Sequence, residues 1–501
     1  MKKNWLRMLS VMMCFLMVFG LMTGCGSTAT DEGTAEKQVV IATDVELKSL
    51  DPMGNWSGAC YFIYWTCYDR LLNYDYETGE FQPGLATDWE VSEDGMEYIF
   101  HLRDDVKWHD GTQFTAKDVV YTVARGIETS NGNYPKVDHA EAIDDYTVKF
   151  VMQEPNSLVM DKQWIGDSAV IKDGSGDTIA TEIMGTGPFK VKEWRVGEHL
   201  IIEANPDYWG EKAQVQEIKF VCYPEASARL MAVQAGDLDI TSIAPANVKA
   251  AMEDENIYVV SAPGTYLRYV AFNHGNEYLS NKLVRQAINH AINKEDVLAA
   301  AIEGMGVTAD AIVPTTVGGH NPDIEGYEYD IEKAKALLAE AGYPDGFEIE
   351  LTYASPAYDL YAQIIQANLK EVGITVKLDG KESAAASEKI NAAQHEMCLT
   401  GRGASDANYY VNVMHSSHLT DGRNQLNMND PEIDELLNQI FVTEGAERDA
   451  IYKEAQVVAH EEAVIVPLVV ANNYYAANKD IEGLGVIPTG GNDFRFIKWA
   501  E

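Results

Sequence analysis

The chain has 501 residues, of which 46% are hydrophobic, and its 78 acidic residues against 38 basic ones give a formal net charge of −40. This length supplies about three domain-sized units or one large two-lobed body, and the apolar content is sufficient for a substantial core. A surface this negative repels nucleic acid and anionic lipid, so we expect no nucleic-acid partner. We interpret the acidic coat as solvation, with a cation-collecting role as the alternative.

Residues 1–24 have the composition of a secretory signal peptide. Three basic residues among the first seven precede the apolar run 8–22, which is too short for a membrane span. The run ends in the letters LMTGC, which resemble a bacterial lipobox with Cys25 as the lipidated new N-terminus. An ordinary signal peptide with an incidental cysteine is the alternative. Residues 26–37 are small and polar, which indicates a flexible tether in front of the folded part.

The first half of the folded part mixes strands and helices. Apolar residues that alternate or run continuously predict strands, whereas apolar residues three and four apart predict helices. The clearest unit is a β-hairpin at 189–204 with its turn at Gly197, and Gly185 and Gly187 before it allow a close approach of two backbone segments or a turn with positive φ. In chain order we predict strand 39–42, helix 61–72, strand 98–103, helix 116–125, strand 146–152, the hairpin, helix 225–235 and strand 238–240.

The second half shows a stronger helical pattern. The order strand, helix, strand from residue 343 onward indicates an α/β lobe with a mostly parallel sheet. No internal repeat and no long linker divides the folded part, so we expect one compact body. The predicted elements are strand 269–273, helix 283–292, helix 330–341, strand 347–353, helix 361–372, strand 374–378, helix 430–441 and strand 462–470.

No motif in the sequence argues for catalysis. The chain contains no Gly-x-Ser-x-Gly elbow and no phosphate-binding loop, and its two His-Glu pairs lack the second histidine of a zinc protease. We therefore predict that the protein is not an enzyme and needs no cofactor or metal. His415 and His418 form a metal-binding pair only if they are helical, and two exposed polar histidines are the favoured alternative. Cys60 and Cys67 fit buried thiols better than a zinc site, while a disulfide between them stays open.

Several stretches resemble one protein family. They are FHLRDDVKWHDG within 89–125, GTGPFKVKEW and ANPDYWG within 185–210, QAGDLD at 234–239 and VRQAI at 284–288. In this order they are typical of the family 5 extracellular solute-binding proteins, the peptide, dipeptide and nickel binders of ABC importers. The resemblance covers nearly the whole mature chain. It implies an α/β fold of the periplasmic-binding-protein type (type II, large cluster C type), with two lobes, an extra subdomain inserted in lobe I, and ligand in the cleft between the lobes.

The resemblance also implies domain boundaries. Hinge strands are expected near Asn273 and near 471–479. The expected parts are the signal peptide 1–24, the lipidated tether 25–37, lobe I at 38–272 with the inserted subdomain at about 65–184, lobe II at 273–477, and a C-terminal return to lobe I at 478–501.

Ligand residues are implied only in part. In the oligopeptide and dipeptide binders an aspartate shortly after a Gly-Trp pair holds the α-ammonium group of the peptide, and the nearest match here is GRGASD at 401–406. Arg402 replaces the tryptophan, and we expect its guanidinium, surrounded by small residues that leave it room, to bind an acidic group. Asp406 then holds an amine of the same ligand or fixes Arg402 in place.

Three further residues complete the expected ligand-binding set. Tyr409 is expected to flank an apolar or aromatic part of the ligand. Asn55 and Trp56 lie in a loop after the first strand. The alternative for Asp406 is a side chain that only shapes its loop, and the alternative for Arg402 is a surface ion pair with one of the many carboxylates.

These features predict a substrate-binding lipoprotein of an ABC transporter. We expect a monomer, anchored by its N-terminal lipid at the outer face of the cytoplasmic membrane, that delivers a small solute to the permease. A peptide is the favoured solute. A nickel chelate, a sugar or another metabolite is the alternative, and a surface adhesion or structural lipoprotein is the outsider.

The lipobox interpretation predicts that Cys25→Ala abolishes membrane attachment, because the variant lacks the sulfur that carries the lipid. The variant and the wild type are expressed in a bacterial host, and membranes are separated from soluble fractions by centrifugation. We expect the variant to leave the membrane fraction. A variant that stays as firmly membrane-bound as the wild type would show that Cys25 is not the anchor.

Overall fold

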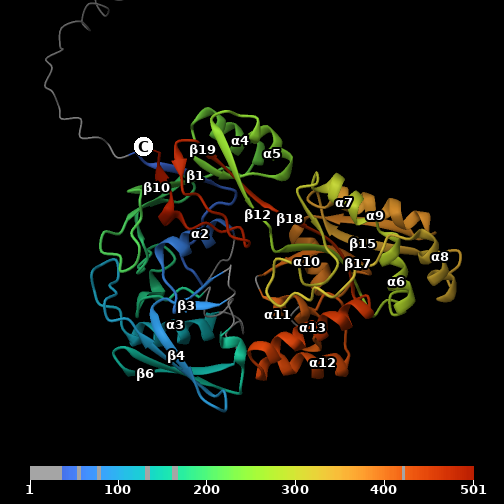
Figure 1. Ribbon diagram of the computed structural model, residues 1–501, viewed down its shortest axis with the longest axis horizontal. Coiled ribbons are helices and arrows are strands. Elements are labelled where there is room, and N and C mark those ends of the chain that lie inside the picture. Colours follow the sequence, from blue (N-terminus) through green and yellow to red (C-terminus); the bar gives the residue numbers. More distant parts are fainter. Residues whose placement is uncertain are drawn as a thin grey trace, which may run out of the picture. The chain divides into compact units, whose positions relative to one another are not determined.

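Two large mixed β-sheets carry the folded part of the chain (Figure 1). The computed structural model describes residues 37–53, 58–75, 80–129, 136–160, 168–404, 406–419 and 424–500, without the side chains of 58–62 and 158. The predicted signal peptide, Cys25 and the tether as far as residue 36 lie outside the described residues, and so do Asn55 and Trp56. No helix in the described part of the chain is long and apolar enough to cross a membrane.

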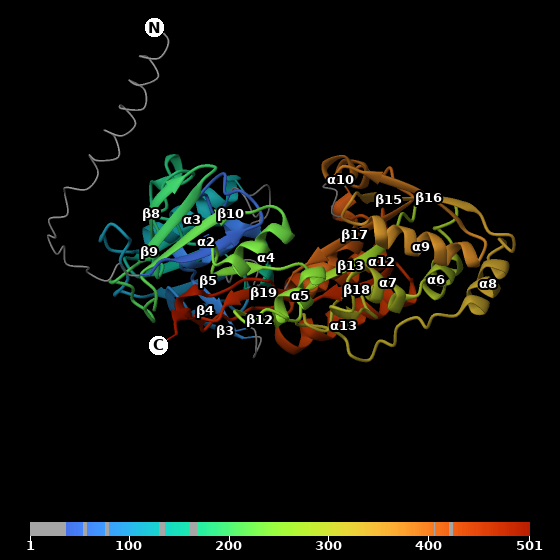
Figure 2. The same ribbon diagram turned by 90° about the horizontal axis from the view of Figure 1, so that it is seen from above.

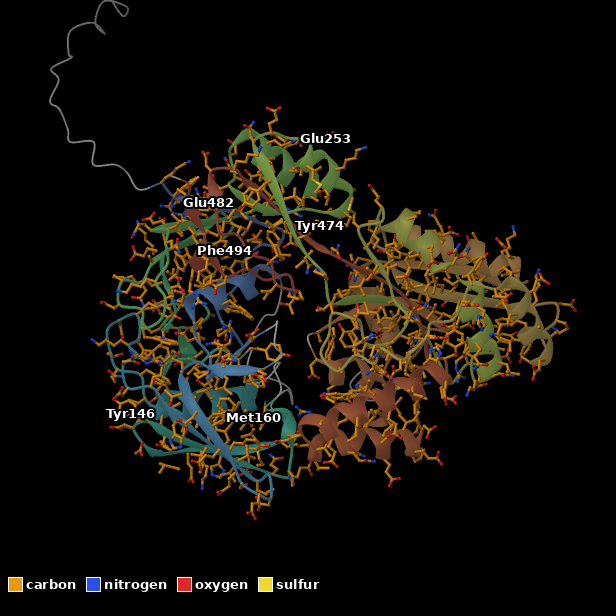
Figure 3. The ribbon with its side chains drawn as sticks, in the orientation of Figure 1. Tyr146, Met160, Glu253, Tyr474, Glu482 and Phe494 are labelled. Carbon is orange, nitrogen blue, oxygen red and sulfur yellow. The ribbon has the colours of Figure 1, made fainter. Side chains whose placement is uncertain are left out.

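The first sheet has seven strands in the order β12-β19-β11-β1-β10-β9-β8. β1 runs parallel to β10 and β11, and the other pairs are antiparallel. Phe189, Ile202 and Phe494, the last of which is labelled in Figure 3, pack in its core. The strands are β1 (Val39–Thr43), β8 (Phe189–Arg195), β9 (His199–Ala204), β10 (Glu217–Cys222), β11 (Ile240–Ser242), β12 (Ile257–Ala262) and β19 (Asn473–Asn478), and the helices of this lobe include α2 (Gly58–Cys67), α4 (Ala226–Ala235) and α5 (Pro245–Met252).

The predicted hairpin at 189–204 is confirmed as β8 and β9, which turn at Gly197 with a φ of +79°. Two glycines stand at its entry because the backbone passes another segment there. A Cβ on Gly185 would lie 1.8 Å from the carbonyl oxygen of Cys67, and the N–H of Gly187 donates to the same oxygen at 3.0 Å. The predicted close approach is therefore present, between the end of α2 and the start of the hairpin.

A second, four-stranded antiparallel sheet in this part of the chain has its own core. Phe100 and Phe150 lie on paired strands with ring centroids 5.0 Å apart, and Trp108 is buried beneath the same sheet. α3 begins with one of the two hydrogen bonds of a capping box, because Asp118 accepts from the N–H of Thr115 at 2.8 Å. The elements are β4 (Ala86–Val91), β5 (Glu97–Leu102), β6 (Val137–Asp144), β7 (Thr147–Met152) and α3 (Ala116–Thr129), preceded by the small pair β2 (Leu72–Tyr74) and β3 (Phe81–Pro83).

The second large sheet has six strands in the order β14-β18-β13-β17-β15-β16. The predicted parallel arrangement holds for β15, β16 and β17 but is wrong for β13, β14 and β18, which pair in antiparallel fashion. The strands are β13 (Tyr266–Phe272), β14 (Gly306–Thr308), β15 (Glu348–Ala354), β16 (Thr375–Lys381), β17 (Met397–Gly403) and β18 (Ile465–Ala471). The helices are α6 (Lys282–Ala291), α7 (Lys294–Ala301), α8 (Ile331–Glu340), α9 (Asp359–Glu371), α10 (Ser383–Asn391), α11 (Ala407–Val411), α12 (Pro431–Asn438) and α13 (Gly445–Glu461).

The chain crosses between the two large sheets twice. β12 ends at Ala262 in the first sheet and β13 begins at Tyr266 in the second, while β18 ends at Ala471 in the second and β19 begins at Asn473 in the first. The first crossing thus precedes the hinge predicted near Asn273. β13 therefore belongs to the second lobe and β19 to the first. The sequence did not predict this, because a pattern of apolar residues marks a strand without specifying which sheet it enters.

His109 connects the four-stranded subdomain to the hairpin entry. Its Nε2–H donates to the carbonyl of Gly187 at 3.1 Å, and its Nδ1 accepts from the N–H of Gly185 at 3.4 Å. Burial lowers the pKa of His109 from 6.5 to about 4, so the ring is neutral at pH 7. Between these two pH values the unfolded chain binds a proton here that the folded chain does not, and stability therefore falls as the pH drops through this window.

We expect His109→Gln to make the protein less sensitive to acid, because glutamine offers a donor and an acceptor but does not titrate. The free energy of unfolding in urea is measured at pH 7 and at pH 4.5. The variant should lose about 1–3 kcal/mol less than the wild type over this interval. The exposed His139, changed to Gln, is the matched control. An equal loss in the wild type and both variants would contradict a neutral, buried His109.

Candidate ligand-binding site

The parallel strands of the first large sheet end on the side where the chain crosses to the second lobe. β12 runs in the same direction as β1, β10 and β11, because β11 and β12 are both antiparallel to β19. The carboxyl ends of these strands, at Thr43, Cys222 and Ser242, therefore lie at the edge from which Ala262 leads to the second lobe. Ligands of open α/β sheets bind outside the carboxyl ends of the strands.

The second large sheet presents the same kind of edge to the crossings. β13 and β17 lie side by side in the second large sheet (Figure 2). They pair in antiparallel fashion, with Tyr266 opposite Gly403. The carboxyl ends of β15, at Ala354, and of β17 therefore lie beside the amino end of β13, where the first crossing arrives. β18 also ends here, at Ala471, where the second crossing leaves. We call this side of the second sheet, with Tyr266, Ala354, Gly403 and Ala471, the crossing edge.

Arg402 lies at the crossing edge, on β17 opposite Leu267, with only 8% of its surface exposed. Its Nη1–H donates to the carbonyl of Tyr409 at 2.7 Å, and its Cζ lies 4.6 Å from the centre of the Tyr409 ring. The quadrupole of the ring attracts the cation in this position. Arg402 and Tyr409 thus contact each other, and Arg402 is buried and does not lie at the surface. Their contact with a ligand stays a prediction.

Asp406 begins the helix that follows this loop. One of its carboxylate oxygens accepts from the N–H of Asn408 at 2.6 Å and lies 3.5 Å from the hydroxyl of Tyr452. It is the N-cap residue of α11, and its backbone also bridges to Gly318. These contacts are those of the loop-shaping alternative, while a contact between Asp406 and an amine of the ligand stays a prediction.

Two buried tyrosines make hydrogen bonds near this loop, Tyr410 from α11 and Tyr269 from β13. The hydroxyl of Tyr410 donates to the carbonyl of Thr265 and accepts from the N–H of Ala404 at 3.0 Å, which ties the loop to the first crossing. The hydroxyl of Tyr269 donates to Gln425 Oε1 at 2.7 Å. Burial raises the pKa of Tyr269 to about 12, although the positive charge of Arg402 offsets part of the rise. Tyr269 is therefore a neutral hydrogen-bond donor at pH 7.

The glycines on either side of Arg402 make space on the opposite face of the strand. A Cβ on Gly401 would lie 2.0 Å from Cε1 of Tyr266, and one on Gly403 would lie 2.8 Å from Cδ2 of the same ring. Side chains alternate between the faces of a strand, so positions 401 and 403 face away from Arg402. The predicted space around the guanidinium of Arg402 is therefore wrong. The glycines accommodate Tyr266, which the sequence analysis did not consider.

His415 and Cys67 belong to the other groups that the sequence offered for a metal. His415 is 8% exposed, and its Nε2 lies 3.2 Å from Oδ1 of Asn438, so the expectation of an exposed histidine is wrong at this position. Within the described ranges, no group of three or more His, Cys, Asp or Glu side chains is placed to hold a metal ion. Cys67 is a free thiol whose pKa burial raises to about 12, and the side chain of Cys60 lies outside the described residues.

The lobes touch at another place besides the crossings. Ser157, which follows the four-stranded subdomain, is 4% exposed. Its Oγ lies 2.8 Å from the carbonyl oxygen of Thr443 and 3.1 Å from that of Ile440, both in the second lobe. Nη1 of Arg448 lies 3.3 Å from the same Oγ and donates to it. The Ser157 hydroxyl thus donates to the backbone of the second lobe and accepts from Arg448 of the same lobe. It links the two lobes noncovalently.

The structure has two α/β lobes joined by two crossings, and strand ends of both lobes are directed to those crossings. This arrangement is a two-lobed binding-protein fold. The family model described as "Bacterial extracellular solute-binding proteins, family 5 Middle" matches residues 80–422. The chain therefore belongs to this family, whose members are the extracytoplasmic solute-binding components of ABC importers, as the sequence motifs predicted.

Individual relatives agree with this assignment. The dipeptide-binding protein of Escherichia coli (strain K12) is 31% identical over 473 residues, which cover 86% of this chain and 88% of the relative. Heme-binding protein A of Haemophilus influenzae is 29% identical over 471 residues, covering 85% and 86%. The solved structure of the periplasmic binding protein DppA from Helicobacter pylori in complex with peptide STSA has a TM-score of 0.78 at 29% identity, covering 93% of this chain and 98% of that one.

Proposed function

We propose that this protein captures a short peptide between its lobes, at the crossing edge, and delivers it to the permease of an ABC importer. The observation that carries the proposal is the convergence of strand ends from both sheets on the two crossings. The choice of a peptide is supported by the E. coli and H. pylori relatives, whose names refer to a dipeptide and to the peptide STSA.

The proposal assigns ligand contacts to Arg402, Asp406 and Tyr409, together with Asn55 and Trp56. The first three are supported by their place at the crossing edge and in the loop that follows it. In this role Arg402 binds an acidic group of the peptide, and Tyr409 packs against an apolar part. A charge-assisted contact of a guanidinium with a carboxylate is stronger than a neutral hydrogen bond.

The proposal includes closure of the lobes around the peptide. It is supported by the contact of Ser157 with Thr443 and Arg448, which requires the lobes to be close together. It also places the protein, as a monomer, on the outer face of the membrane through lipid on Cys25, which is supported by the LMTGC run and the polar tether. Neither lobe closure nor attachment to the membrane requires a catalytic group.

A non-peptide solute is the second candidate. It is favoured by the 29% identity with heme-binding protein A over 85% of this chain, because that identity is close to the 31% shared with the dipeptide-binding protein. A nickel chelate or a sugar belongs to the same alternative. Fold similarity alone does not separate these solutes, since function depends on the residues of the site.

The protein is tested with a pool of di-, tri- and tetrapeptides, with the free amino acids of the same composition as the control. We expect peptides to raise its stability, by about 2.7 kcal/mol at a concentration of about 100 times Kd. The radius of gyration in solution scattering should decrease, and mass spectrometry should recover the peptides intact. Stabilisation by hemin but by no peptide would replace the peptide with the second candidate. Stabilisation with an unchanged radius would contradict closure, and cleaved peptides would contradict a binding protein.

A further inference from the structure

Arg268 is a cation at the crossing edge that the ligand set above does not include. It is the third residue of β13, where the chain has just entered the second lobe, and it lies opposite Gly401 of β17. A Cβ on Gly401 would lie 3.0 Å from Nη1 of Arg268, so the guanidinium lies against a strand position that carries no side chain. The side chain of Arg268 is half-buried.

Aromatic rings surround this guanidinium. Its Cζ lies 4.0 Å from the centre of the Tyr266 ring and 5.5 Å from that of Tyr358, and the hydroxyl of the buried Tyr361 is directed to it. Burial raises the pKa of Tyr361, and the charge of Arg268 offsets part of that rise. The contact with the Tyr266 ring holds the guanidinium in place, so less conformational freedom is lost when an anion binds.

The hydrogen-bonding potential of Arg268 is largely unused within the part of the chain that the structure describes. A guanidinium has five N–H donors. Five other arginines pair with carboxylates, namely Arg103, Arg125, Arg195, Arg285 and Arg495. Arg229 instead donates to three backbone carbonyls. Among the described residues, Arg268 contacts neither a carboxylate nor a backbone carbonyl, in a chain with 78 acidic residues.

Arg268 and Arg402 point to opposite faces of the sheet. They lie on adjacent strands, but Arg268 is opposite Gly401 whereas Arg402 is opposite Leu267. Paired residues of antiparallel strands share a face, and successive residues alternate. One carboxylate therefore does not bridge the two guanidinium groups, and the effects of changing either arginine are separable.

We propose that Arg268, with Tyr266, Tyr358 and Tyr361, forms a subsite for a carboxylate group of the captured solute. The planar fork of the guanidinium binds both oxygens of the carboxylate, and the tyrosine rings restrict the group to that plane. The carboxylate comes from the C-terminus of a peptide or from an acidic side chain. This inference rests on the proposed function, because it places the carboxylate in the solute of a binding protein.

The test uses alanine peptides of two, three and four residues, each as the free acid and as the C-terminal amide. Binding to the wild type, Arg268→Gln and the control Arg195→Gln is measured by isothermal titration calorimetry. Arg195 is an exposed arginine that pairs with Glu193 and to which no ligand contact is assigned. We expect the wild type to bind the free acid roughly 30-fold or more tightly than the amide. Arg268→Gln should lose this preference and bind both forms like the amide, while Arg195→Gln should retain it. Arg268→Lys, which keeps the charge but not the fork, should show an intermediate preference.

Three results would overturn the subsite. They are equal binding of acid and amide to the wild type, equal weakening of both forms by Arg268→Gln, or loss of the preference in Arg195→Gln as well. Circular dichroism and thermal unfolding verify that each variant is folded, and Arg268→Lys replaces Arg268→Gln if that variant is not. If no alanine peptide binds the wild type, this result contradicts the proposed peptide function but not yet the carboxylate subsite. Citrate and its trimethyl ester then form the test pair, and the absence of an Arg268-dependent preference for citrate overturns the subsite.

Discussion

The pairing of β13 with both β17 and β18 is the constraint on which the arrangement of the molecule depends. This strand enters the second lobe from the first crossing, and β18 leaves the lobe at the second crossing, so antiparallel pairing brings both connections to one edge. The same pairing places the carboxyl ends of β15 and β17 beside them. A shift of one residue in the pairing of β13 with β17 would put Arg268 and Arg402 on the same face, because paired residues share a face and side chains alternate along a strand. The place of the proposed site, and of Arg268 within it, therefore depends on this register.

The residues that carry the family resemblance are mainly structural. Asp69 is buried and accepts hydrogen bonds from Thr186 at 2.9 Å, Tyr208 at 3.0 Å and Trp209 at 2.9 Å. Burial raises its pKa, and these three donors offset part of the rise. The network joins the end of α2 to the hairpin and the turn after it, so the ANPDYWG motif is explained by packing. The motifs thus identify the fold well and the solute poorly.

Much of the fold was predictable because its signals are local. The hairpin at 189–204 needed only two apolar runs and a glycine turn, and α3 needed a capping residue and an apolar stripe. α13 was not predicted, although it has 17 residues, because its apolar positions are interrupted by charged ones and it begins without a side-chain cap. The mostly parallel sheet was wrong for β18 because the strand's apolar run reports burial but not direction.

The candidate site was predictable only as a segment of the chain. The loop after β17 was located from GRGASD, but the face of each side chain depends on long-range pairing. Gly401 was interpreted as space for Arg402, its neighbour in sequence, whereas it accommodates Tyr266 and Arg268 from a strand about 130 positions earlier. A single arginine in an apolar strand is weak evidence for a ligand site until its neighbours in the fold are known. For the same reason, sequence reasoning named Arg402 and passed over Arg268.

The most direct test of this account is a crystal structure of the protein purified together with the solute that it carries from its host. The account predicts electron density for an intact solute in contact with residues from the strand ends of both large sheets, with its acidic group against the guanidinium of Arg268. Solute density that contacts only one lobe, or that lies away from β13 and the loop after β17, would contradict it.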